Sequence, residues 1–207
     1  MTELVDSEDK KEIKFIKTNT LNIAYEESGA PDGFPVILLH GFPYDPRSWD
    51  KVVPVLASKG YRVLVPYLRG YGQTSFLDPQ VERTGEQAAI GQDLMDFTNM
   101  LDIDAYAVSG YDWGNRAACI ASVLEPQKIK ALVSINGYSI QNTLERKSPP
   151  TGLQTARLWY QWYFHTEQGR TGLEKYRHSI IRHLWETWSP TWNYNDESYN
   201  SSAPSFE

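Results

Sequence analysis

The stretch AVSGYDWGNR, residues 107–116, decides the fold of this chain of 207 residues. An apolar run ends in a small residue, Asp112 stands between two glycines, and an alanine-rich segment follows. This order indicates a buried strand, a sharp turn and a helix, with the acid at the turn. Glycine at both flanks suits a nucleophile on a strained strand-to-helix corner, because only glycine leaves room for the tightly folded backbone.

Two roles for Asp112 fit this position. At the start of a helix its carboxylate faces unbonded N–H groups and the positive end of the helix dipole, which favour the ionised form. An ionised carboxylate can attack carbon and form an ester. The plainer alternative is a helix cap, for which Asp is a common residue, and the turn by itself is compatible with both roles.

Strand patterns and helix patterns alternate on both sides of this turn. Short apolar runs indicate buried strands, and amphipathic stretches between them indicate helices. The first two strands alternate apolar and polar residues, which predicts an antiparallel pair at the N-terminal edge of an otherwise parallel α/β sheet. Thr84 and Gln87 have the spacing of a helix capping box. We expect strands at 12–18, 21–27, 35–40, 61–66, 105–110 and 129–137, and helices at 48–60, 84–101 and 113–126.

Two further motifs follow strands of this predicted sheet. HGFP (40–43) closes the strand at 35–40, and RGYG (69–72) follows the strand at 61–66. Together with GYDWG (110–114), in this order, they make the chain resemble the α/β-hydrolases with an aspartate nucleophile, namely the soluble epoxide hydrolases and haloalkane dehalogenases. The resemblance covers about residues 12–188 and implies an α/β-hydrolase fold, a mostly parallel sheet flanked by helices, with a helical cap.

The resemblance also implies roles for individual residues. Asp112 is expected to be the nucleophile that forms an aspartyl ester. In this fold the loop after a buried strand and the residue after the nucleophile supply the oxyanion-hole donors, here the backbone N–H groups of Phe42 and Trp113. The expected substrate pocket is lined by His40, Pro43, Tyr111, Arg116, Trp162 and Tyr163.

Two features favour epoxide hydrolysis within this family. Haloalkane dehalogenases usually carry a halide-binding Asn directly after the His-Gly pair, where this chain has Phe42. The segment YQWYF (160–164) resembles the epoxide-hydrolase cap segment whose first tyrosine polarises the epoxide oxygen. On that match Tyr160 is a catalytic hydrogen-bond donor to the developing alkoxide while Asp112 opens the ring. The structural alternative for Tyr160 and Tyr163 is an aromatic belt that packs the cap on the core.

A third feature favours dehalogenation instead. Arg116 lies one helical turn after Asp112 and on the same side. Fluoroacetate-type dehalogenases have a similar Arg that clamps a carboxylate substrate, and Trp162 resembles their fluoride-facing tryptophan. Their Arg directly after the nucleophile is Trp113 here, so an internal ion pair is the more economical role for Arg116. Hydrolysis of a haloalkane or haloacid therefore remains an alternative.

The family hydrolyses its ester with water activated by a His that a separate acid orients. The resemblance places both groups after the cap, and none of the four histidines of this chain has that position. We therefore expect the N-terminal part of a hydrolase core over 1–137, truncated after about the sixth strand. Residues 138–207 are expected to form a helical cap that is incomplete or leads into a missing C-terminal segment of the core. An open sheet edge predicts oligomers or pairing with another chain. A non-catalytic binding protein is the alternative that these missing groups favour.

Composition limits the other classes of function. The net charge of −6, without a Lys/Arg cluster, argues against nucleic-acid binding. No apolar run reaches the length of a membrane span, and the polar N-terminus is unlike a signal peptide. The lone Cys119 cannot form an internal disulfide, so the cytoplasm is the expected compartment. No metal-ligand spacing or phosphate-binding loop is present, so we expect no cofactor and a small apolar epoxide or halogenated substrate.

Overall fold

The computed structural model describes residues 12–135, residue 140 and residues 148–207. The chain divides into two compact units, Met1–Ser139 and Ile140–Glu207, which are described separately below. The boundary expected from the sequence, after residue 137, falls outside the described residues.

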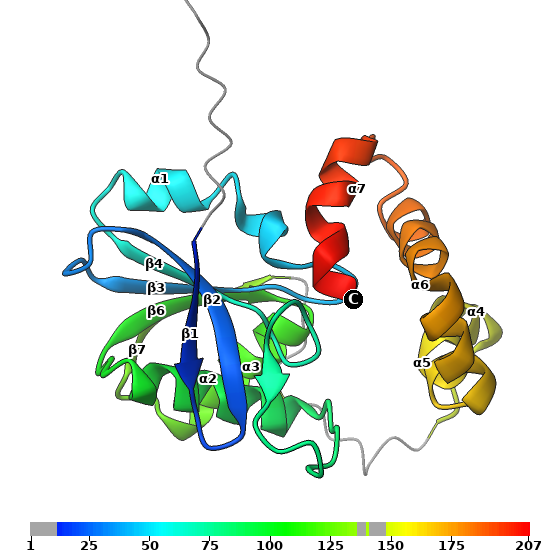
Figure 1. Ribbon diagram of the computed structural model, residues 1–207, viewed down its shortest axis with the longest axis horizontal. Coiled ribbons are helices and arrows are strands. Elements are labelled where there is room, and N and C mark those ends of the chain that lie inside the picture. Colours follow the sequence, from blue (N-terminus) through cyan, green and yellow to red (C-terminus); the bar gives the residue numbers. More distant parts are fainter. Residues whose placement is uncertain (1–11, 136–139, 141–147) are drawn as a thin grey trace, which may run out of the picture. The chain divides into compact units, whose positions relative to one another are not determined.

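A mixed sheet forms the centre of the first unit (Figure 1). Its strand order is β1-β2-β4-β3-β6-β7, with β5 paired to β2. β4, β3, β6 and β7 are parallel, whereas β1 and β5 pair antiparallel with β2, as does β4. The predicted antiparallel edge on a parallel sheet is thus confirmed, and only the two-residue β5 was missed. The strands are β1 (Ile13–Lys17), β2 (Leu21–Gly29), β3 (Pro35–Leu39), β4 (Arg62–Pro66), β5 (Ser75–Phe76), β6 (Tyr106–Tyr111) and β7 (Ile129–Ile135).

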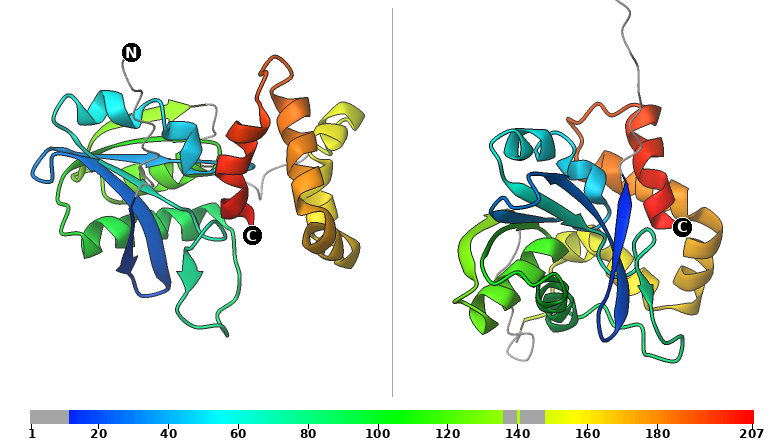
Figure 2. Two further views of the ribbon diagram at one scale, coloured as in Figure 1. Left: turned by 45° about the horizontal axis from the view of Figure 1, so that its top comes forward. Right: turned by 60° about the vertical axis from the view of Figure 1, so that its left-hand side comes forward.

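Helices cover both faces of this sheet, as the two views of Figure 2 show. Side chains alternate between the faces of a strand, and β3 shows the result. Ile37 and Leu39 pack in the cluster that includes α2 and α3, whereas Val36 and Leu38 pack in the cluster that includes η1 and α1. Both faces of β3 are therefore buried, which explains its continuous apolar sequence. The helices are η1 (Pro46–Trp49), α1 (Val53–Ala57), α2 (Gln87–Met100) and α3 (Trp113–Leu124).

The start of α2 differs from the prediction. The apolar stripe is confirmed, since Ile90, Leu94 and Phe97 are buried. The capping box is wrong, because the helix begins at Gln87 and Thr84 lies outside it. The hydroxyl oxygen of Thr84 accepts a hydrogen bond from the Glu86 N–H (3.3 Å), a contact within the loop.

The second unit is helical, and residues 148–207 contain no strand. No helix is predicted from the sequence after residue 189, yet α7 (Asp196–Ser202) forms there. Asn195 caps this helix by accepting a hydrogen bond from the Ser198 N–H (2.9 Å), and Tyr199 is buried with its ring edge-to-face on Trp185 (5.4 Å). Burial of one aromatic ring and a good cap thus order a segment that is polar overall. The helices are α4 (Gly152–Arg157), α5 (Trp159–Phe164), α6 (Glu167–Trp188), α7 (Asp196–Ser202) and η2 (Ala203–Phe206).

Among the described residues, no helix has the length and apolar character that crossing a bilayer requires. The same part of the chain contains no cluster of three or more His, Cys, Asp or Glu side chains that could hold a metal ion.

Candidate functional site

Asp112 alone forms the corner between β6 and α3. Its backbone has φ +50° and ψ −119°, a conformation that costs a residue with a side chain about 1–3 kcal/mol. A Cβ atom on Gly110 would lie 2.6 Å from the carbonyl carbon of Gly114, and one on Gly114 would lie 2.4 Å from the carbonyl oxygen of His40. Backbone atoms cannot give way as flexible side chains do. The expectation that this corner needs glycine at both flanks is therefore confirmed.

The side chain of Asp112 does not cap the helix that it precedes. Although Asp112 occupies the N-cap position, it accepts no hydrogen bond from the first turn of α3. Its Oδ1 instead accepts a hydrogen bond from the backbone N–H of Phe42 (3.1 Å). The capping alternative is therefore wrong, and the partly exposed carboxylate is oriented by the loop that follows β3.

That loop, residues 40–45, lies directly against the corner. A Cβ atom on Gly41 would come within 2.6 Å of the Asp112 Cβ, so only glycine allows this approach. The Tyr44 N–H donates to the Gly41 carbonyl (2.9 Å), which closes a turn around Phe42. Trp113 is the first residue of α3, and the first N–H groups of a helix have no acceptor within the helix.

His40 joins two of the sequence motifs. Its ring is fully buried, its Nε2 accepts a hydrogen bond from the Leu68 N–H (3.1 Å), and Tyr71 packs edge-on at 4.7 Å. Burial lowers the pKa of His40 to about 4, against weaker opposing hydrogen bonds to the backbone of Gly41 and Tyr44. His40 thus has no exposed surface with which to line a pocket, and we assign it a structural role. Pro43 is also buried and offers little surface to a ligand.

Arg69 fastens the RGYG loop to α2. Its guanidinium donates to both carboxylate oxygens of Asp93 (2.7 Å each) and to the carbonyl oxygen of Thr84 (2.8 Å). Burial raises the pKa of Asp93, and the hydrogen bonds from Arg69 oppose that shift. This pair was not predicted from the sequence. The available signal was a carboxylate three residues after Ile90, on the apolar stripe of a helix, where an unpaired acid is costly.

The side chain of Tyr111 reaches η1. Its hydroxyl donates to the Ser48 Oγ (2.9 Å), and its ring lies between those of Tyr44 (6.3 Å) and Trp49 (5.8 Å). Burial raises the pKa of the Tyr111 phenol, while hydrogen bonds with Ser48 and the Gly41 backbone oppose that rise. The phenol therefore stays protonated and donates at neutral pH. The sequence predicted a pocket residue here but not its bond to Ser48.

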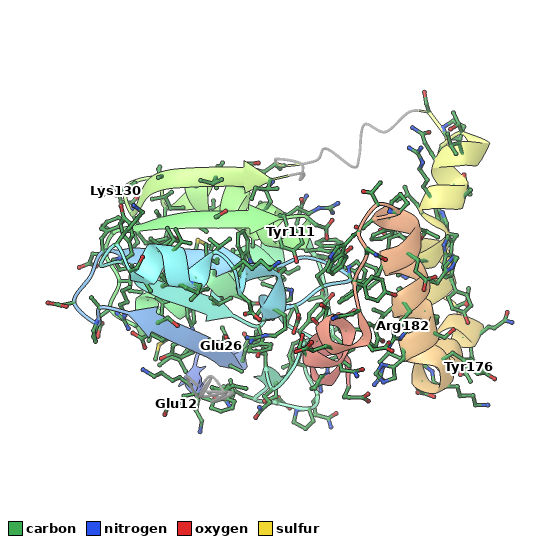
Figure 3. All side chains as sticks on the ribbon, turned by 90° about the horizontal axis from the view of Figure 1, so that it is seen from above. Glu12, Glu26, Tyr111, Lys130, Tyr176 and Arg182 are labelled. Carbon is green, nitrogen blue, oxygen red and sulfur yellow. The ribbon has the colours of Figure 1, made fainter. Side chains whose placement is uncertain are left out.

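A second polar contact lies on the other side of η1. The Tyr67 hydroxyl donates to Oε1 of the buried Glu26 (2.8 Å), and the Arg47 guanidinium pairs with the same oxygen. Figure 3 labels Glu26 on β2 and Tyr111 at the end of β6. Glu26 and Arg47 belong to no motif that could have identified them from the sequence.

Arg116 lies beside the residue that follows Asp112. Its guanidinium carbon is 4.1 Å from the centroid of the Trp113 ring, a cation–π contact. Its backbone N–H donates to the Asp112 carbonyl oxygen (3.1 Å), the first hydrogen bond of the helical turn.

The aromatic residues expected from the cap lie on α5, in the second unit. The Tyr160 hydroxyl accepts a hydrogen bond from Gln161 (3.2 Å), and its ring packs edge-on against Trp188 (5.1 Å). Trp162 is 59% exposed. The Tyr163 hydroxyl packs closely against Gly172, where an added Cβ atom would lie only 1.9 Å from the hydroxyl oxygen. Tyr163 is thus packed within its own unit. The approach of Tyr160 and Trp162 to Asp112 stays a prediction.

Comparison with known proteins identifies the fold of the chain. A family model described as alpha/beta hydrolase fold matches residues 35–180. This range includes the HGFP loop, the RGYG loop, most of α6 and the elbow, which is the corner at Asp112 between β6 and α3. The chain belongs to the α/β-hydrolase fold family.

Similar α/β-hydrolases carry the name epoxide hydrolase. Epoxide hydrolase 2 of Siraitia grosvenorii is 34% identical over 133 residues, which make up 64% of this chain and 41% of that protein. Epoxide hydrolase A of Mycobacterium tuberculosis is 28% identical over 151 residues, 73% of this chain and 45% of that protein. A crystal structure from Klebsiella pneumoniae, of a protein provisionally called an epoxide hydrolase, is 40% identical with a TM-score of 0.90, and the match covers 94% of this chain and 65% of that one. The chain therefore spans less than half the length of these two curated relatives.

Proposed function

We propose that this α/β-hydrolase acts on an epoxide, with Asp112 as the nucleophile that opens the ring and forms an aspartyl ester. The observation that supports this most is the strained corner at Asp112, whose Oδ1 is held by the Phe42 N–H at 3.1 Å. A side chain held in that way keeps its other carboxylate oxygen available for attack. The names of the similar proteins point to the same substrate class.

In the proposed reaction Oδ2 of Asp112 attacks one epoxide carbon, and the bond from that carbon to the ring oxygen breaks. The ring oxygen becomes an alkoxide and takes a proton from the Tyr160 phenol, which regains a proton from solvent. The ester is then attacked by water at its carbonyl carbon, and the N–H groups of Phe42 and Trp113 stabilise the resulting oxyanion by about 3 kcal/mol each. The bond between the carbonyl carbon and the alkyl oxygen then breaks, and that oxygen takes one proton of the water. The second proton goes to solvent, and release of the diol leaves Asp112 as a carboxylate. None of the four histidines of this chain is assigned as the base of the water step.

Trapping the ester tests this proposal. After incubation with styrene oxide, mass spectrometry of digested protein should show the mass of one added substrate on the peptide that contains Asp112. Asp112→Asn should abolish the adduct, because a neutral amide is a poor nucleophile. Asp102→Asn is the matched control, since Asp102 is also an aspartate with positive φ (+53°) but is exposed and lies outside the site. An adduct that survives Asp112→Asn would exclude the mechanism.

A second candidate is hydrolysis of a haloacid, because the cationic Arg116 lies over Trp113, next to the nucleophile. Release of halide from a haloacetate, lost in Arg116→Ala, together with no adduct from styrene oxide would favour this candidate. The absence of both reactions would leave a non-catalytic binding protein.

A further inference from the structure

Polar contacts fasten the short helix η1 on two opposite sides. On one side the guanidinium of Arg47 pairs with Glu26 of β2, whose side chain is 6% exposed and also accepts from the Tyr67 hydroxyl (2.8 Å). On the other side Ser48 accepts a hydrogen bond from the Tyr111 hydroxyl (2.9 Å) at the end of β6. η1 therefore connects two strands of the sheet that are not neighbours.

The helix is also held internally, so that its two contacts act on one rigid piece. Oδ1 of Asp45 accepts from the Arg47 N–H (3.2 Å), and the Ser48 hydroxyl donates to the Asp45 carbonyl (2.7 Å). A charged pair that is largely buried holds its geometry, because losing one partner leaves the other charge without compensation. The pairing of Arg47 with Glu26 thus fixes the place of the Ser48 hydroxyl.

The hydrogen bond between Ser48 and Tyr111 completes a closed path of covalent bonds and hydrogen bonds that includes Asp112, the proposed nucleophile. Tyr111 is covalently joined to Asp112, Asp112 accepts from the Phe42 N–H (3.1 Å), and the chain runs from Phe42 through the loop into η1 and Ser48. Ser48 returns to Tyr111 through the phenolic hydrogen bond. With this path closed, the loop cannot move away from the corner without breaking one of these two hydrogen bonds.

We propose that Ser48 and Tyr111 are positioning residues that hold the Phe42 N–H on Oδ1 of Asp112, with Glu26 and Arg47 as their anchor. The inference rests on the proposed function only in treating the Phe42 N–H as an oxyanion donor. Neither hydroxyl touches the reacting atoms in this role. Each acts through the backbone of the loop or of the elbow.

The amide of Phe42 reports this geometry without any substrate. In ¹H–¹⁵N spectra of the 207-residue chain, Ser48→Ala and Tyr111→Phe should each shift the Phe42 amide proton upfield, the direction that Asp112→Asn defines by removing the charged acceptor. Amide exchange at Phe42 should become roughly fivefold faster, the loss expected for one net hydrogen bond. Because both substitutions remove the same bond, the double variant should show no larger effect than either single variant.

Ser58→Ala is the matched control, because the Ser58 hydroxyl also donates to a carbonyl three residues earlier, that of Val55 (2.9 Å), but Ser58 is the C-cap of α1. It should leave the Phe42 amide unchanged. The inference is overturned if the Phe42 amide stays in place in either Ser48→Ala or Tyr111→Phe, with thermal unfolding showing that both are folded, or if their effects add. Failure of the unsubstituted chain to form the Asp112 ester would refute the proposed function and leave this result standing.

Discussion

A methyl group at position 114 would stand 2.4 Å from the carbonyl oxygen of His40 and 2.5 Å from that of Leu39. We expect Gly114→Ala to lower the free energy of unfolding by about 3 kcal/mol, because the close approach of β3 and the elbow must open. Gly85→Ala is the control, since its Cβ meets nothing within 4 Å, and it should be neutral or stabilise by about 0.5 kcal/mol. Urea unfolding of both variants measures the difference, and equal midpoints would contradict this steric account.

His40 makes stability depend on pH in a defined window. Its pKa is lowered from 6.5 to about 4 in the folded chain, so the unfolded chain binds more protons between these two values. The free energy of unfolding should therefore fall by about 3 kcal/mol as the pH falls from 6.5 to 4, and the contribution is fully present above pH 6.5. In His40→Gln, which keeps an acceptor for the Leu68 N–H, this part of the pH dependence should vanish. Parallel stability curves for the two proteins, from urea unfolding at each pH, would show that His40 has no such effect.

At the scale of elements, Arg69 and Asp93 join the RGYG loop to α2. The side chains of this pair are 8% and 10% exposed, so Arg69→Met leaves a buried carboxylate without its partner and should cost about 3–5 kcal/mol. The double variant Arg69→Met/Asp93→Leu should recover most of that loss, because it removes both charges. Urea unfolding of the four proteins of the cycle measures the coupling. Glu167→Gln, in the exposed ion pair between Glu167 and Arg170 (2.6 Å), is the control and should have no measurable effect. Additive losses at positions 69 and 93 would contradict the coupling.

The elements that the sequence predicted correctly are those whose pattern is set by their own residues. β3 and β4 are apolar on both faces, and α2 has a stripe at helical spacing, so each could be identified from a short window. The errors arose where a distant partner decides. Thr84 lies outside α2 and its carbonyl accepts from Arg69, and α7 forms because Tyr199 packs against Trp185. No local window contains both members of either contact.

The same distinction holds for the candidate site across the molecule. The elbow, its glycines and the Phe42 loop were predicted because each lies in a short motif that steric limits require. The contacts of Glu26, Arg47 and Ser48 were not predicted. These residues come from β2 and η1, and their contacts form only once the sheet has formed. Motifs therefore located Asp112, the proposed nucleophile, and tertiary structure was needed to find the contacts that we propose orient it.

For the whole molecule, β7 is the last strand of the sheet and pairs only with β6 among the described residues. Its apolar side chains are exposed, with Leu132 at 38%, Val133 at 55% and Ile135 at 40%, and an apolar strand edge favours pairing with another strand. We expect the 207-residue chain to self-associate through this edge, and Val133→Lys to weaken the association about tenfold, because pairing would bury the added charge. Val55→Lys is the control, since Val55 is equally exposed (54%) but lies on α1. Sedimentation velocity over a concentration series measures the effect; if both variants associate equally, β7 is not the contact.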